Sequence, residues 1–184
     1  TLIGTALDIS GDIDVDGTSN LDAIDVDGTA NFAADATFAA DIITATAGTS
    51  NTRLGVNAGN SIVENGNYNV LVGGEAGTAI TEGDNNVAVG YQAGDALETG
   101  SNNVAIGFRA LSAEDGHGTN IAIGSDTLKV QNAGANAYNI AIGHDAGKAV
   151  STGVKNTLIG GSAGDSLTTN GLNVAVGYGA LSTE

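Results

Sequence analysis

The stretch "NNVAVGYQAG" at residues 85–94 recurs along most of the chain with few changes. Seventeen residues later the chain reads "NNVAIGFRAL", and after another seventeen it reads "TNIAIGSDTL". Eight such units follow one another at spacings of 17 to 19 residues, and each holds an Asn four residues before a Gly. The pairs are Asn51 and Gly55, Asn69 and Gly73, Asn86 and Gly90, Asn103 and Gly107, Asn120 and Gly124, Asn139 and Gly143, Asn156 and Gly160, and Asn173 and Gly177. A unit restated this often predicts a repeat architecture in which each copy stacks on the next.

The three residues between each Asn and Gly predict a short strand. The outer two are β-branched or Leu and lie on one face, while the middle residue is usually Ala. We expect the larger pair to fill the inside of the coil. The Ala face, too small to fill a core and too apolar for water, is then expected to meet a second layer or partner chains at close range. These trimer-facing candidates are Ala88, Ala105, Ala122, Ala141 and Ala175.

A compensation inside the unit indicates close packing. Four residues after the Gly the chain has either Gly or Leu, and where it has Gly an aliphatic residue follows three positions later. Gly94 with Leu97 is one example, whereas Leu111 is followed by Glu114. The next unit repeats the second arrangement with Leu128 and Gln131. One aliphatic side chain per coil keeps the core volume constant, as a close-packed interior requires.

The fold class follows from these patterns. No 3.6-residue stripe is present, and the Gly, Asn, Ser and Thr clusters between units are typical of turns. We predict an all-β protein: a repetitive parallel β-helix or β-roll solenoid over residues 48–184, rising about 4.8 Å per coil. Gly and Asn are expected to turn the chain, because Asn tolerates the left-handed conformation and stacked Asn side chains bond along a ladder. A ligand-binding or ice-binding Asn face is the alternative interpretation.

Residues 1–47 follow a different pattern. "DIDVDGT" at 12–18 and "AIDVDGT" at 23–29 alternate apolar and acidic residues, which predicts half-buried strands with a polar outer face. We interpret this segment as a β-rich acidic shaft or connector. Asp12, Asp14 and Asp16 also match the start of an EF-hand loop, yet the twelfth position is Ala23 instead of the bidentate Glu. A solvated acidic strand is therefore preferred, with a Ca²⁺ site between chains as the alternative and no other cofactor expected.

Composition limits the partners. The chain has 184 residues and a net charge of −16, from 21 acidic and 5 basic residues, so it cannot assemble the basic patch that nucleic acid requires. No 18-residue apolar run predicts membrane insertion. There is no Cys, which excludes disulfides and thiolate metal sites. Since the last unit stops in mid-pattern, we expect the sequence to be part of a longer protein.

The repeat resembles known surface fibres. "NNVAIG", "YNIAIG" and "LNVAVG" resemble the "NxVAIG" strand of trimeric autotransporter adhesin heads, and "NNVAVGYQAGDALETGSNNVAIGFRAL" is similar to repeats of bacteriophage tail fibres. The resemblance covers residues 48–184. It implies a left-handed parallel β-roll or β-helix with three chains around one axis, on a cell or virion surface. A monomeric solenoid is the alternative, because single-chain solenoids also stack identical repeats.

Few residues offer chemistry, and we predict that the protein is not an enzyme. His144 occupies a corner position of the repeat, and His117 lies in the turn "EDGHGT". Tyr91 and Phe108 should lie on adjacent coils, where stacked aromatic rings either contact a glycan or wedge a corner closed.

The expected function is mechanical. We predict an extracellular segment of a homotrimeric tail fibre or adhesin, which holds a receptor-binding element away from the particle or cell and contacts other fibre or virion proteins. The alternative is a binding module whose rod itself contacts a glycan or Ca²⁺.

Overall fold

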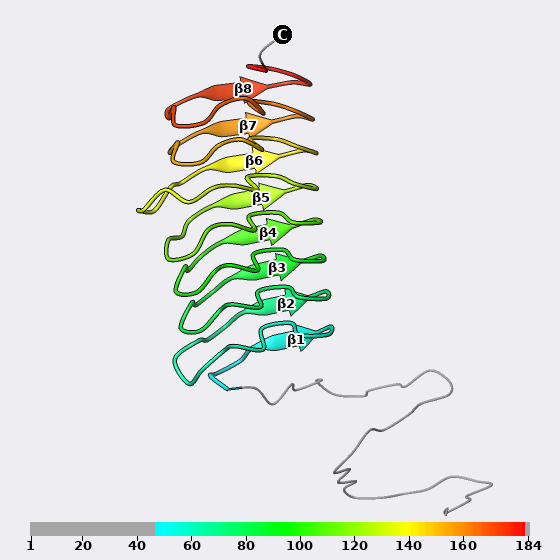
Figure 1. Ribbon diagram of the computed structural model, residues 1–184, viewed down its shortest axis with the longest axis vertical. Coiled ribbons are helices and arrows are strands. Elements are labelled where there is room, and N and C mark those ends of the chain that lie inside the picture. The colour runs from blue at the N-terminus through cyan, green and yellow to red at the C-terminus, as the bar shows by residue number, and fades with distance from the viewer. Residues whose placement is uncertain (1–46, 183–184) are drawn as a thin grey trace, which may run out of the picture. The chain divides into compact units, whose positions relative to one another are not determined.

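The protein, in a computed structural model that describes residues 47–182, is a parallel β-solenoid (Figure 1). Eight strands of three residues form one parallel sheet in chain order, so each strand pairs with its neighbours in sequence. The predicted all-β solenoid is confirmed. The acidic shaft predicted for residues 1–47 and the Ca²⁺ candidates Asp12, Asp14 and Asp16 lie outside the described residues, apart from residue 47 itself.

Each strand occupies the three positions between the repeated Asn and Gly. The strands are β1 (Thr52–Leu54), β2 (Val70–Val72), β3 (Val87–Val89), β4 (Val104–Ile106), β5 (Ile121–Ile123), β6 (Ile140–Ile142), β7 (Thr157–Ile159) and β8 (Val174–Val176). The register pairs equivalent positions of neighbouring repeats, as with Ala88 opposite Ala105. The longer repeats therefore place their extra residues in loops and leave the sheet undisturbed.

Hydrogen bonds between coils extend well beyond the strands. After the strand, the Arg109 N–H donates to the Tyr91 carbonyl across 3.0 Å, and on the return path the Asn102 N–H donates to the Asp84 carbonyl across 2.9 Å. Bonds of this kind satisfy backbone groups that a coil with so short a strand would otherwise leave unpaired. Stacking is thus what makes a small coil stable.

The two faces of the strand are the reverse of those expected. The middle residues Ala88, Ala105, Ala122 and Ala141 are fully buried inside the single chain, and Ala175 is 3% exposed. The prediction that these alanines face partner chains is therefore wrong. A coil of about 17 residues encloses little volume. The middle position holds Ala in most coils and the fully buried Leu71 and Leu158 in two others, while the first and third strand residues point outward.

The predicted compensation in the core is confirmed. Ile80, Leu97 and Val150 are fully buried where the earlier position is Gly, and Leu111 and Leu128 are fully buried where that position is Leu. Leu111 and Leu128 have φ values of 52° and 47°, close to the 54° of Gly94. The backbone path is thus the same in both arrangements, and either residue supplies the aliphatic group to one interior site.

The glycine that ends each strand is required by backbone geometry. Gly73 has φ +132°, and a Cβ there would lie 2.6 Å from the carbonyl oxygen of Gly90 on the next coil. A side chain at this position would therefore be strained and would also push the coils apart.

The asparagine that precedes each strand bridges the coils. Asn86 Oδ1 accepts the backbone N–H of Asn103 across 3.0 Å, and its Nδ2 donates to the Gly100 carbonyl across 2.8 Å. The same Oδ1-to-amide bond joins every consecutive pair from Asn51 to Asn173, at 2.8 to 3.2 Å. The asparagine ladder expected from the sequence is therefore present, and its members from Asn51 to Asn156 are buried.

The second role expected of asparagine is wrong. Positive φ falls on the residue before each Asn, with values from 52° to 65°. Those positions are occupied by residues as different as Ser50, Tyr68, Lys155 and Leu172. The Asn itself is selected for its amide, which both accepts and donates, and not for a left-handed backbone.

Within residues 47–182 there is no helix of the length and apolar character needed to span a bilayer.

Two adjacent glycines provide a matched test of the strand-ending turn. Gly73→Ala should lower the free energy of unfolding by about 3 kcal/mol, since it adds backbone strain to a clash with the next coil. Gly74→Ala should change it by less than about 0.5 kcal/mol, because a Cβ there meets only Tyr91 at 3.5 Å. Urea unfolding followed by circular dichroism measures both values. Equal effects of the two substitutions would contradict the close approach at Gly73.

The ladder is tested at Asn86. Asn86→Ala leaves the Gly100 carbonyl and the Asn103 N–H without partners in a buried place, so we expect a loss of about 2 to 4 kcal/mol. Asn85→Gly is the control, because Asn85 is exposed and already has φ 57°. If both variants unfold at the same urea concentration as the native chain, the ladder does not stabilise the solenoid.

Candidate functional site

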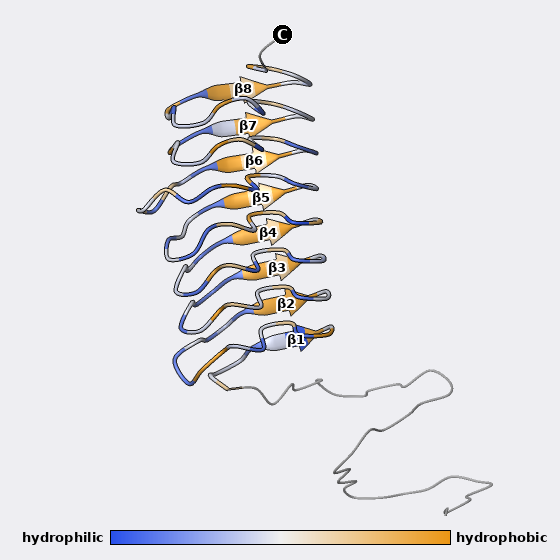
Figure 2. Cartoon of the chain, viewed as in Figure 1, coloured by the Kyte–Doolittle hydropathy of each residue, from blue (hydrophilic) through white to orange (hydrophobic). Residues whose placement is uncertain are grey.

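The described surface carries an apolar stripe along the sheet. It consists of the first and third residue of every strand, and we call it the outer face. Its first column is Thr52, Val70, Val87, Val104, Ile121, Ile140, Thr157 and Val174, and its second is Leu54, Val72, Val89, Ile106, Ile123, Ile142, Ile159 and Val176. Figure 2 shows the strands after β1 mostly in hydrophobic colour, with hydrophilic residues directly before them.

The outer face is open to solvent in the single chain. Val70, Ile142 and Ile159 are between 36% and 39% exposed, and the other strand residues of β3 to β5 on this face are half-buried. Because each side chain is flanked by equivalent residues one coil away, half-burial is what neighbouring side chains alone would produce. At β8, where no further coil follows, Val174 is 73% exposed. No charged side chain belongs to either column, and contiguous apolar surface of this kind marks an interaction site.

The predicted aromatic pair is confirmed as neighbours on adjacent coils. The rings of Tyr91 and Phe108 stack with centroids 5.8 Å apart and planes 18° apart, and the Arg109 guanidinium lies 4.5 Å from the Phe108 centroid. Tyr91 lies one coil before Phe108, and Arg109 extends toward Asp126 one coil after it, at 3.1 Å. The two rings remain 48% (Tyr91) and 44% (Phe108) exposed. They therefore form an exposed aromatic pair on adjacent coils, with Tyr91 and Arg109 each packed against Phe108.

Charged groups continue the same corner. The Gln92 amide donates to Glu75 across 2.7 Å, Lys129 lies 3.3 Å from Asp126, and Lys148 lies 3.1 Å from Asp145. Glu75 raises the pKa of Tyr91 by its negative charge and by a hydrogen bond. Ion pairs at such partly exposed positions contribute about 0 to 1 kcal/mol each. These charged contacts therefore fix the positions of side chains at the turn after the strand, and contribute little to the stability of the fold.

The two histidines lie in different surroundings. His144 is on the corner, as its place in the repeat predicts, with its Nδ1 3.4 Å from Asp145. His117 instead lies 3.5 Å from the buried Glu114, which sequence reasoning did not connect with it. Burial raises the pKa of Glu114, and the nearby His117 opposes this shift. The sequence does contain a sign of this contact: Glu114 stands at a position where other coils have an interior aliphatic residue.

The aromatic corner is tested by a double-mutant cycle. Tyr91→Ala, Phe108→Ala and the double variant should give a coupling free energy of about 0.5 to 1.5 kcal/mol, the usual value for a stacked pair. The measurement is thermal or urea unfolding of the four proteins. A coupling of zero would show that the rings do not stack in solution.

Comparisons with known proteins add no assignment. A scan against protein-family models, a search of curated proteins and a search of solved structures each found no match to the chain. The resemblance of the repeat to tail fibres and adhesin heads therefore stays a prediction from sequence. The feature of the chain that bears most directly on function is the outer face.

Proposed function

We propose that the solenoid is a structural segment of a homotrimeric surface fibre, in which the outer faces of three chains meet around a common axis. The observation that carries the proposal is the outer face itself. Its two columns run along all eight strands and contain only Thr, Val, Leu and Ile, and none of their side chains is fully buried within residues 47–182. Burial of such a surface contributes about 25 cal/mol per Å² of apolar area, so leaving it in water is unfavourable.

A second and third copy of the same chain are the occupants that this geometry suits. The face repeats with the period of the solenoid, so an identical chain in parallel orientation presents the same residues at every level. A row of β-branched side chains on a regular sheet also offers the interlocking surface that close packing needs. The number three comes from the resemblance to adhesin heads and tail fibres, whose rods are built from three chains.

The mechanical role follows from the way the coils are joined. Continuous hydrogen bonding along the axis leaves free strand edges only at β1 and β8 within the described part of the chain. The acidic surface keeps neighbouring fibres apart over a distance of about 8 Å at physiological salt. We infer an extracellular rod, on a virion or a bacterial cell, that positions a receptor-binding element and joins other fibre proteins at its ends.

Assembly through the outer face is tested by charge. The double substitution Val104→Lys and Ile106→Lys on β4 should convert a trimer of three 17.9 kDa chains to a monomer. Circular dichroism should still show the β fold, because both side chains point to solvent in the single chain. The measurement is light scattering coupled to size exclusion. Val130→Lys is the matched control, since Val130 is 43% exposed but lies off the outer face.

Two results would contradict the assembly. One is a native chain with the mass of a monomer at micromolar concentration, and the other is dissociation by Val130→Lys to the same extent as by the double variant. Immunogold labelling of intact particles or cells tests the placement. Label along projecting fibres supports the surface role, and label confined to the cell interior rejects it.

A further inference from the structure

One position interrupts the aliphatic interior of the solenoid. Seven residues after the strand-ending Gly, the chain places the buried Ile80, Leu97 and Val150, but between them it places Glu114 and Gln131. Both polar side chains are fully buried. An unpaired carboxylate in such a place is unfavourable by several kcal/mol unless a counter-charge or hydrogen bonds compensate it.

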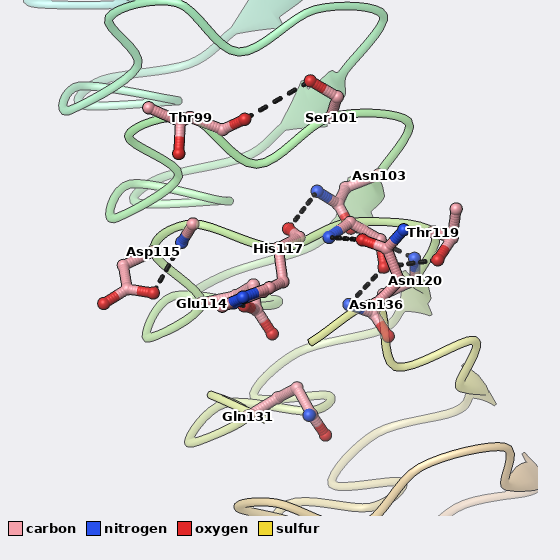
Figure 3. Close-up of polar contacts among 12 residues, drawn as sticks. Thr99, Ser101, Asn103, Glu114, Asp115, His117, Thr119, Asn120, Gln131 and Asn136 are labelled. Carbon is pink, nitrogen blue, oxygen red and sulfur yellow. Dashed lines mark hydrogen bonds and ion pairs between the residues drawn. The ribbon is translucent and has the colours of Figure 1, made fainter. Parts of the chain in front are cut away.

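The neighbouring groups compensate it only in part. Burial raises the pKa of Glu114 and outweighs the His117 side chain and the backbone N–H groups of His117 and Ala133, which favour its charged form. The buried Nε2 of Gln131 on the next coil donates no hydrogen bond. Gln131 uses its Oε1 to accept from Asn139 across 2.9 Å. Figure 3 shows the side chains of Glu114 and His117 side by side, with Gln131 apart from them. Within residues 47–182, the ion-pair partner of Glu114 is His117, whose Nδ1 lies 3.5 Å from its Oε1 and whose side chain is 32% exposed.

Asp115 brings a third donor to the same place. One ligand atom each from Glu114, Asp115 and His117 lies within 4.8 Å of the other two. The Asp115 carboxylate accepts a hydrogen bond from the Gly116 N–H across 2.5 Å and another from the Asn132 side chain. These bonds hold one part of the carboxylate and keep it ionised, because they lower the pKa of Asp115.

The longest repeat spacing, 19 residues between Gly124 and Gly143, also bears on this loop. Asn136 accepts a hydrogen bond from the Gly118 N–H across 3.0 Å, so the lengthened segment braces the loop that carries His117. The lengthened segment also changes the hydrogen bond of one ladder asparagine. From Asn51 to Asn156, the other ladder asparagines donate to a carbonyl 14 or 15 residues ahead, whereas Asn120 Nδ2 donates to the nearby Gly118 carbonyl, at 3.5 Å. The irregular coil therefore gives up one regular contact of the ladder where it supports the three donors.

We propose that Glu114, Asp115 and His117 bind a divalent transition-metal ion, with Zn²⁺ as the natural probe. An imidazole nitrogen with two carboxylate oxygens is a donor set that zinc accepts at about 2.0 to 2.2 Å. Calcium prefers oxygen ligands alone, six to eight of them, which three side chains including a histidine do not provide. Binding requires Asp115 and His117, which are at least partly exposed on the loop, to close onto the fixed Glu114, and water completes the coordination.

Metal binding would cross-link two parts of one coil. The ion compensates the buried charge of Glu114 and joins the solenoid interior to the loop at residues 115–118. Because the folded solenoid holds Glu114 in place and the ion offsets the unfavourable burial of its charge, Zn²⁺ should bind the folded state more tightly than the unfolded chain and raise its stability by mass action. This inference is independent of the trimer, since all three ligands belong to a single chain.

The test is isothermal titration of the full chain with ZnCl₂ after treatment with EDTA, together with thermal melting. We expect one ion per chain and a melting temperature that rises with zinc. Glu114→Gln and His117→Asn should each weaken zinc binding at least tenfold. His144→Asn is the matched control, because His144 also lies beside a carboxylate, Asp145, but has no third ligand. Its affinity for zinc should equal that of the native chain.

A second readout separates ligation from folding. In EDTA, Glu114→Gln should melt at a higher temperature than the native chain, since it removes the buried charge and keeps the shape, yet it should lose the rise produced by zinc. Zinc binding at native affinity by His117→Asn would overturn the proposal, and so would a native chain with no saturable binding. An equal loss in His144→Asn would assign zinc to exposed histidines generally and would also overturn it.

Discussion

The hydrogen bonds of the buried asparagine side chains are the interaction on which the rest of the structure depends. Each Asn from Asn51 to Asn156 accepts a hydrogen bond from the backbone of the next coil. All of these except Asn120 also donate to the carbonyl of the residue 14 or 15 positions ahead, which joins two points of the coil path. Few side chains can do both, because Asp lacks the donor and Ser has a shorter reach. Once the amide fixes the start of the strand and the Gly fixes its end, the register of every following coil is determined.

That constraint explains why the strand is so short and so uneven. Three residues between fixed corners leave one side chain inside and two outside. The interior is narrow, so the inner position is Ala in most coils and Leu at Leu71 and Leu158. A further aliphatic group from one of two sites adds to the core in most coils. The two outward side chains then form columns whose apolar character the single chain does not use. The short strand between a fixed Asn and a fixed Gly thus keeps the coil compact and also creates the apolar outer face proposed for assembly.

Much of the fold could be predicted from the sequence because the repeat states it eight times. The spacing of the repeat predicts the strand positions, the parallel stacking and the adjacency of Tyr91 and Phe108. It also predicts that Leu111, followed by Glu114, replaces the combination of Gly94 and Leu97. The assignment of faces did not, because a strand that is apolar on both sides carries no alternation, and side-chain size suggested the wrong inner face at Ala88. The left-handed conformation of the residue before each Asn could not be predicted either, because that position holds residues as different as Tyr68 and Leu172. The contact between Glu114 and His117 needed the path of the loop, which composition does not specify.

Hydrogen exchange measured by NMR on the native chain tests the asparagine ladder most directly. The backbone amides of Asn86, Asn103 and Asn156 lie just before the strands, and their acceptors are side-chain oxygens of the preceding coil at 2.9 to 3.0 Å. The account predicts that these amides exchange as slowly as the strand amides of Val87 and Val104, in the class that opens only with global unfolding. Exchange at the rate of unprotected amides would contradict the ladder and, with it, the ordering of the coils.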